Sequence, residues 1–140
     1  MDRTALAVSL PGSFARQLTA GPPIPTGVVT TADPHEAITP VPFGTTMLVS
    51  RYGFQAGRTA RIELAGSAPA TGRIDMTMLD GWEDVLLFAP PDGPSISLEP
   101  HTCAPGASSL PEHSRDGLRG LAPGARLRVR ASILPTPAGR

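Results

Sequence analysis

Apolar and polar residues alternate with a period of two along much of this chain, which predicts β strands. In residues 59–64 apolar side chains alternate with polar or charged ones, and the same period returns in residues 73–78. Because successive side chains of a strand point to opposite faces, each stretch should bury one face and leave the other in water. The turn at residues 66–72, bounded by glycines, should join the two strands into a β-hairpin.

Two later stretches have stronger patterns. Val85–Phe88 is continuously apolar and should be a central strand buried on both faces. Residues 126–133 have the most regular alternation in the chain. The side chains expected to point inward are Leu127, Val129, Ala131 and Ile133, and those expected to point outward are Arg126, Arg128, Arg130 and Ser132. Residues 135–140 should form a frayed tail.

The first half of the chain predicts shorter strands that are separated by proline-rich segments. The expected strands are Ala5–Leu10, Ser13–Leu18, Val28–Thr31 and Thr45–Tyr52. Three prolines within Gly21–Gly27 remove backbone donors, so this segment should have no regular structure. Asp33–Gly44 should be a loop for the same reason, with at most one turn of helix after Asp33.

The glycine and proline content points to the same fold class. The chain has 17 prolines and 15 glycines among its 140 residues. These residues work against long helices and favour the many turns of an all-β protein. Strands that recur about every ten to twelve residues are typical of an antiparallel β-sandwich. We therefore predict a single all-β domain over residues 1–140, an antiparallel β-sandwich with a core of its own.

Charge and cysteine content exclude several classes of function. Twelve basic and twelve acidic residues give a formal net charge of zero, whereas a nucleic-acid or anionic-membrane surface needs an excess of basic residues. Cys103 is the only cysteine, so no internal disulfide can form. No apolar stretch is long enough to cross a bilayer, and no metal-ligand spacing is present. We expect a cytoplasmic protein with no cofactor, metal, nucleic-acid or membrane partner.

The densest set of polar groups follows a strand-like run, Ser95–Glu99. Two apolar residues alternate there with serines, which predicts a half-buried strand with Glu99 at its end. Pro100 should then end regular pairing, because it has no N–H to donate. This places the Glu99 carboxylate at a strand terminus, with His101 in the loop beyond it. Loops carried by a rigid sheet are a usual position for catalytic and binding residues.

This stretch leads into the second of three motifs that follow one another along the chain. They are Ile24-Pro25-Thr26-Gly27, Glu99-Pro100-x-Thr102 and Gly117-Leu118-x-x-Leu121-x-Pro123-Gly124. In this order they resemble the C-terminal half of the aldose 1-epimerase (galactose mutarotase-like) family. The resemblance implies a truncated β-sandwich of the galactose mutarotase type and an isomerase that interconverts the α and β anomers of an aldose. It also implies that Glu99 is the catalytic base, which takes the proton from the anomeric hydroxyl.

The sequence departs from the family at two places. The family's acid is a histidine in a His-x-Tyr-Phe-Asn motif, and this chain has no such motif. His101 follows Glu99 by two positions and could face the same site and donate the proton, whereas His35 and His113 fall in other predicted loops. Val49 stands where the family has an aspartate that holds sugar hydroxyls, and a valine side chain cannot accept a hydrogen bond. Its neighbours Ser50 or Arg51 could take the place of that aspartate.

Functions of two different classes stay open. The first is an aldose 1-epimerase-like protein that binds a small sugar in a cleft at Glu99, with His101 and Tyr52 as substrate-binding residues; the Tyr52 ring could stack on a sugar face. The second is a non-catalytic carbohydrate-binding or assembly module that lacks the family's acid. The chain could also be one half of a split enzyme. Exposed sheet edges invite pairing with another chain, so we expect a homodimer.

Overall fold

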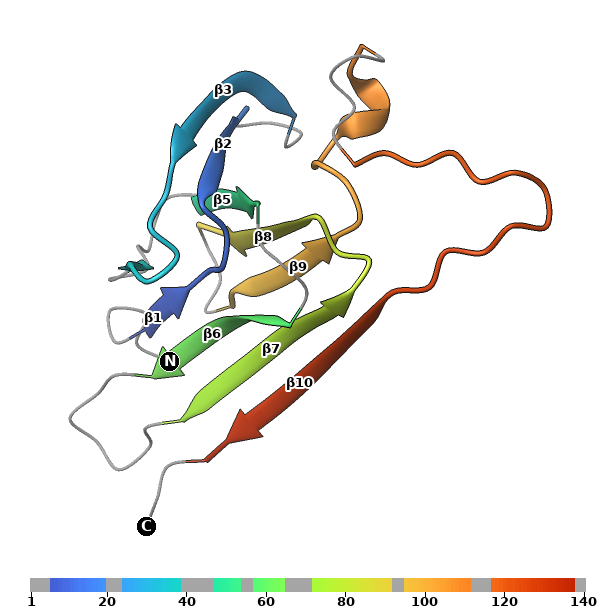
Figure 1. Ribbon diagram of the computed structural model, residues 1–140. Helices are drawn as coiled ribbons and strands as arrows, with labels where there is room; N and C mark the ends of the chain where they lie inside the picture. The colour runs from blue at the N-terminus through green and yellow to red at the C-terminus, as the bar shows by residue number, and fades with distance from the viewer. Residues whose placement is uncertain are drawn as a thin grey trace.

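The computed structural model describes residues 6–19, 24–38, 47–53, 57–64, 72–91, 95–111 and 117–137. In these ranges the chain forms two five-stranded antiparallel sheets and one short 3-10 helix, Ala107–Ser109 (Figure 1). The predicted all-β antiparallel sandwich is therefore confirmed. No helix in the described part of the chain has the length and apolar character that crossing a bilayer requires.

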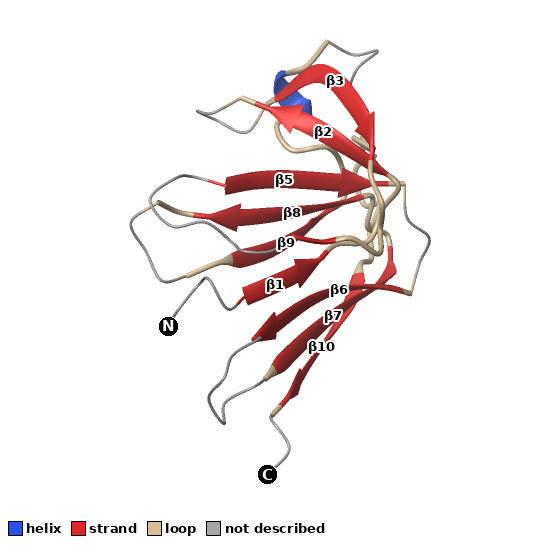
Figure 2. Cartoon of the chain, turned by 90° about the vertical axis from the view of Figure 1, so that its left-hand side faces the viewer, coloured by secondary structure: helices blue, strands red, loops and turns tan. Residues whose placement is uncertain are grey.

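The two sheets, here called sheet A and sheet B, are shown from the side in Figure 2. Sheet A has the order β10-β7-β6-β1-β4, and sheet B has the order β3-β2-β5-β8-β9. The strands of sheet A are β1 (Leu6–Ser9), β4 (Ala37–Ile38), β6 (Arg58–Leu64), β7 (Arg73–Asp80) and β10 (Arg130–Thr136). Those of sheet B are β2 (Phe14–Leu18), β3 (Pro25–Thr31), β5 (Met47–Tyr52), β8 (Asp84–Ala89) and β9 (Ser97–His101).

The core is built from one face of each sheet. The buried apolar residues that form it are Val8, Leu10, Ala60, Met76, Met78, Val85, Leu87 and Ala89. The strands supply alternate residues to it, as a period of two requires. Val49 and Leu98 pack against this core from β5 and β9. The other face of sheet B, which carries the residues between them, is therefore turned away from the core.

Two elements are found as the sequence predicts. β6 and β7 form the hairpin, with Ala60 opposite Met76 in the ladder. The turn predicted at residues 66–72 lies outside the described residues except for Gly72. β8 contains the continuous apolar run and lies between β5 and β9. Val85, Leu86 and Leu87 are buried, as a strand covered on both faces requires.

Prolines interrupt fewer strands than the sequence predicts. β3 begins at Pro25, inside a segment for which no regular structure was expected, and β9 continues through Pro100 to His101. Both predictions are wrong for the same reason: β3 and β9 are the edge strands of sheet B. A proline is tolerated on an edge because its missing N–H can face the unpaired side or stand at the first position. His101 therefore lies on the strand and not in a loop.

The last strand differs most from its prediction. β10 begins only at Arg130, and all of its side chains are exposed. Ala131 and Ile133 lie opposite Met78 and Met76, on the core-side face as predicted, but on an edge strand where they are not buried. An alternating pattern indicates an apolar face, but it does not show that another layer covers that face. The predicted tail is also wrong in part, because Pro135 and Thr136 belong to β10; residues 138–140 lie outside the described residues. Residues 117–129, here called the arm, loop out from the sheets before β10 (Figure 1).

The segment after β3 is a turn and not a turn of helix. Asp33 Oδ1 accepts the backbone N–H of His35 at 2.8 Å, and the backbone N–H of Glu36 donates to the Asp33 carbonyl at 3.2 Å. β4 then pairs with β1, which places Ile38 opposite Val8. The sequence does not predict β4, because two residues are too few to show a period. The rest of the expected loop, residues 39–44, lies outside the described residues.

Candidate active site

The face of sheet B that is turned away from the core carries Glu99, His101 and Tyr52 together. Residues directly opposite each other in an antiparallel ladder point to the same face of the sheet. One row across the sheet is Phe14, Tyr52, Asp84 and His101, and the next is Arg16, Ser50, Leu86 and Glu99. We call this surface the polar face. Its residues come from β2, β5, β8 and β9, which are far apart in the sequence.

Glu99 and His101 form a carboxylate–imidazole pair on the polar face. His101 Nε2 lies 3.6 Å from Glu99 Oε2, and the Ser97 hydroxyl donates to Glu99 Oε1 at 2.7 Å. The two residues are two positions apart on β9, so both side chains leave the same side of the strand. The Glu99 side chain is 42% exposed and that of His101 is 29% exposed. The pair is thus open to a small molecule and already positioned by a neighbouring hydroxyl.

Beside this pair a charged group is buried. Asp84 is fully buried at the start of β8, and the Ser50 hydroxyl lies 2.8 and 3.0 Å from its two carboxylate oxygens. Arg16 Nε lies 3.7 Å from Asp84 Oδ2, and the Arg16 side chain is 7% exposed. A charge removed from water is costly unless it is paired and hydrogen-bonded. The pairing of Asp84 with Arg16 and Ser50 therefore holds three strands of sheet B in a fixed relation beside His101.

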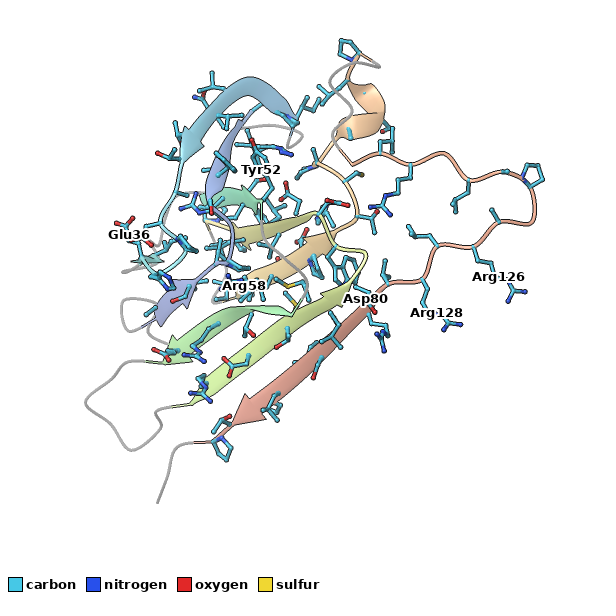
Figure 3. The ribbon with its side chains drawn as sticks, in the orientation of Figure 1. Glu36, Tyr52, Arg58, Asp80, Arg126 and Arg128 are labelled. Atoms are coloured by element: carbon cyan, nitrogen blue, oxygen red, sulfur yellow. The ribbon has the colours of Figure 1, made fainter. Side chains whose placement is uncertain are left out.

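Tyr52 lies between Phe14 and Asp84 in its row of the polar face. The guanidinium carbon of Arg16 is 3.7 Å from the centre of the Tyr52 ring, and the Phe14 ring stacks at 5.3 Å between centroids. A cation over an aromatic face and an offset aromatic pair are both attractive arrangements. They fix the orientation of Tyr52, which Figure 3 labels on β5. The ring is half-buried, so it offers part of its surface.

The turn into β2 lets Phe14 and Arg16 reach Tyr52. Gly12 has a φ of +111°, and a Cβ atom built on it would stand 2.6 Å from the Tyr52 carbonyl oxygen. Only glycine adopts such a backbone conformation without strain and leaves room for the neighbouring strand. This close approach places β2 beside β5, where Phe14 pairs with Tyr52 in the ladder.

The three sequence motifs occupy related places. Ile24–Gly27 spans the start of β3, where the Thr26 hydroxyl lies 3.3 Å from the Gln17 carbonyl oxygen of β2. Gly117, the first residue of the last motif, packs against the end of the Glu99 motif: a Cβ atom there would stand 3.0 Å from the Cys103 Cα atom. The start of the arm is thus packed against Thr102 and Cys103, which follow β9.

Two members of the polar face, Asp84 and Arg16, were missed at the level of sequence. The acidic residues from Asp75 to Asp84 suggest a solvated hairpin end, and this interpretation is wrong for Asp84, which is fully buried. The available signal was its position directly before the apolar run of a central strand. Arg16 gave no signal of its own, whereas Ser50 was named as a substitute for the family's aspartate. Val49 packs against the core and so does not face a ligand on the polar face, whereas its neighbour Ser50 lies on that face.

The other predicted groups lie elsewhere. The cleft expected at Glu99 stays a prediction. A pocket near the start of β6 is lined by neither Glu99, His101 nor Tyr52. It has His35 in its wall instead. His113 lies outside the described residues. Among the described residues, no group of three or more His, Cys, Asp or Glu side chains could hold a metal ion.

Comparisons of the chain with models of protein families, with curated proteins and with solved structures gave no match. The arrangement of the polar face is therefore the observation from which a function has to be argued.

Proposed function

We propose that the chain binds an aldose on the polar face of sheet B and interconverts its α and β anomers, as the resemblance to aldose 1-epimerases implies. The observation that carries the proposal is the Glu99–His101 pair, a carboxylate and an imidazole 3.6 Å apart and both partly exposed on the edge strand β9. The proposed relationship extends to the fold: the sandwich would be a version of the galactose mutarotase type.

The reaction needs an acid and a base at neighbouring points. Opening the sugar ring removes a proton from the anomeric hydroxyl and adds a proton to the ring oxygen. Both oxygens are bonded to the same carbon, so the two protein groups must lie close to each other. In the proposed mechanism Glu99 accepts the hydroxyl proton while protonated His101 donates to the ring oxygen. The aldehyde then rotates, and the same two transfers in reverse close the ring as the other anomer.

The surroundings of the pair suit this role. The Ser97 hydroxyl holds one carboxylate oxygen of Glu99 and leaves the other toward His101. Asp84 lies directly opposite His101 in the ladder, and its pairing with Arg16 and Ser50 fixes the strand next to the pair. Tyr52 lies next to Asp84 on the side away from His101, and its ring supplies an apolar surface for a sugar face. Positioned proton transfer of this kind accelerates reactions by roughly 10²–10⁴-fold.

The proposal is tested by the exchange of the anomeric proton signals of glucose and galactose in NMR. We expect the protein to accelerate the exchange between the α and β signals. The Glu99→Gln and His101→Asn variants should each lose that acceleration, by roughly 10²-fold or more. Glu63→Gln is the matched control, because Glu63 is an exposed glutamate on the other sheet. Full exchange in Glu99→Gln would remove Glu99 from the mechanism.

A second candidate function, assembly with a second copy of the chain, is favoured by β10. This strand is an edge of sheet A, and Ile133 and Leu134 on its opposite faces are 67% and 58% exposed. An exposed apolar edge strand is a template for pairing with another chain. Light scattering after size exclusion should then report a dimer, and Ile133→Lys should convert it to a monomer. A monomeric native protein at high concentration would refute this candidate.

A further inference from the structure

Apart from the polar face, a pocket of about 620 Å³ lies beside the turn that carries Gly12. It is formed where β1 leads toward β2, where the Asp33 turn follows β3, and where β6 begins. The described residues that line it are Ser9, Pro11, Gly12, Ser13, Pro34, His35, Gly53, Gly57, Arg58, Thr59 and Arg61. Its volume lies within the range of sites for small molecules, roughly 300–1,000 Å³.

The chemistry of this lining favours an anion. Its ionisable side chains are two arginines and a histidine, and no carboxylate is among the described lining residues. Ser9, Ser13 and Thr59 add hydroxyl groups, which can donate hydrogen bonds to an oxyanion. Apart from prolines and glycines, the described lining has no apolar side chain. A purely apolar ligand would therefore find little surface to bury there.

The two arginines differ in how much of their charge is available. Arg61 donates from Nε to Asp75 Oδ1 at 2.7 Å, and this hydrogen bond raises the pKa of Arg61. Its charge is thus largely balanced by Asp75. Arg58 is exposed and makes no hydrogen bond or ion pair with any residue in the described part of the chain. Figure 3 labels Arg58, the first residue of β6.

Two glycines of the lining have a left-handed backbone and closely packed neighbours. Gly53 has a φ of +75°, and a Cβ atom on it would stand 2.7 Å from the Phe14 ring. A Cβ atom on Gly12 would stand 2.6 Å from the Tyr52 carbonyl oxygen. Both positions therefore require glycine, which fixes this part of the pocket wall.

We infer that this pocket is a second binding site, which takes a small molecule through a phosphate or carboxylate group held by Arg58. A planar guanidinium matches the geometry of both oxyanions and can donate two hydrogen bonds to either. His35 and the hydroxyls of Ser9 and Ser13 add further donors to the lining, whereas the Thr59 hydroxyl is hydrogen-bonded to that of Thr77. None of the residues of the polar face lines the pocket, so this inference does not depend on the proposed epimerase activity.

Isothermal titration calorimetry with inorganic phosphate and with succinate tests the inference. Both titrations are run at equal ionic strength, because salt alone screens exposed arginines. We expect saturable binding of at least one anion, with a millimolar or lower dissociation constant. Tighter binding of phosphate would identify a phosphorylated ligand, and tighter binding of succinate would identify a carboxylated one.

Two arginine variants make the test specific. Arg58→Gln should weaken binding at least tenfold, whereas Arg126→Gln should leave it unchanged, because Arg126 is an equally exposed arginine on the arm (Figure 3). Circular dichroism establishes that both variants fold. Absence of saturable binding of either anion, or an equal loss in the two variants, would overturn the inference.

Discussion

At the scale of single residues, the buried carboxylate of Asp84 sets the most demanding constraint. It is fully buried, accepts from Ser50 and faces Arg16, whose side chain is also almost completely buried. A buried pair contributes little net stability compared with an apolar pair of the same size, but removal of one partner is costly. This arrangement of strands therefore requires Asp84 as the partner of Arg16.

We predict that Asp84→Ala lowers the free energy of unfolding by roughly 3–5 kcal/mol, because it removes the carboxylate that faces buried Arg16. Urea denaturation followed by circular dichroism measures the change. Asp80→Ala is the control: Asp80 pairs with Arg130 at the surface, where such a pair is worth about 1 kcal/mol or less. Similar losses in both variants would show that Asp84 is not a buried ion-pair partner.

Gly12 gives a second prediction at this scale. Gly12→Ala combines a strained φ with a contact of 2.6 Å to the Tyr52 carbonyl oxygen. It should therefore cost more stability than Gly57→Ala, where φ is +83° but nothing lies within 4 Å of the new Cβ atom. The comparison of the two melting temperatures isolates the close approach from the strain that both variants share. A Gly57→Ala variant that melts lower than Gly12→Ala would contradict it.

At the scale of elements, the prediction from sequence succeeds where burial and pattern agree. The patterns of β6 and β7 indicate one buried face, and that of β8 indicates two. All three strands were predicted. β10 has an equally regular pattern, yet its side chains are exposed, because no period can show which faces another layer covers. β3 and β9 were cut short at prolines, because the sequence does not show which strands lie at a sheet edge.

The strand β7 allows a test of this distinction within one element. Met78 and Ile74 lie on the same face of the strand, but Met78 is 1% exposed and Ile74 is 43% exposed. Met78→Ala should cost roughly 2–5 kcal/mol, as large-to-small changes in a core do. Ile74→Ala should cost less than half as much in the same denaturation experiment. Equal costs would indicate that something covers the outer end of β7 in solution.

The candidate site was only partly predictable for a related reason. Glu99, His101 and Tyr52 were named from motif and residue type, and the ladders of sheet B place them on one face. Arg16, Ser50 and Asp84 join them only through strand order, which pairs β2, β5 and β8 across distant parts of the sequence. Local patterns carry no information on such pairing, so Arg16 and Asp84 could be found only from the structure, and Ser50 was named only through the resemblance.

At the scale of the whole molecule, two distinct surfaces are available for ligands. The polar face of sheet B presents the Glu99–His101 pair, and the pocket beside β6 presents the exposed Arg58. The turn through Gly12 separates them, since Phe14 beyond it belongs to one surface and Ser13 to the other. The arm leaves the sheets directly behind the end of β9, and Arg126 and Arg128 are exposed on it (Figure 3).

The central claim is that Glu99 and His101 act together on the anomeric centre of a sugar. Polarimetry of freshly dissolved α-glucose and α-galactose, with and without the native protein, tests it most directly. The account predicts that the rotation of at least one sugar decays faster with protein than in buffer, in proportion to protein concentration. Identical decay of both sugars at high protein concentration would contradict it.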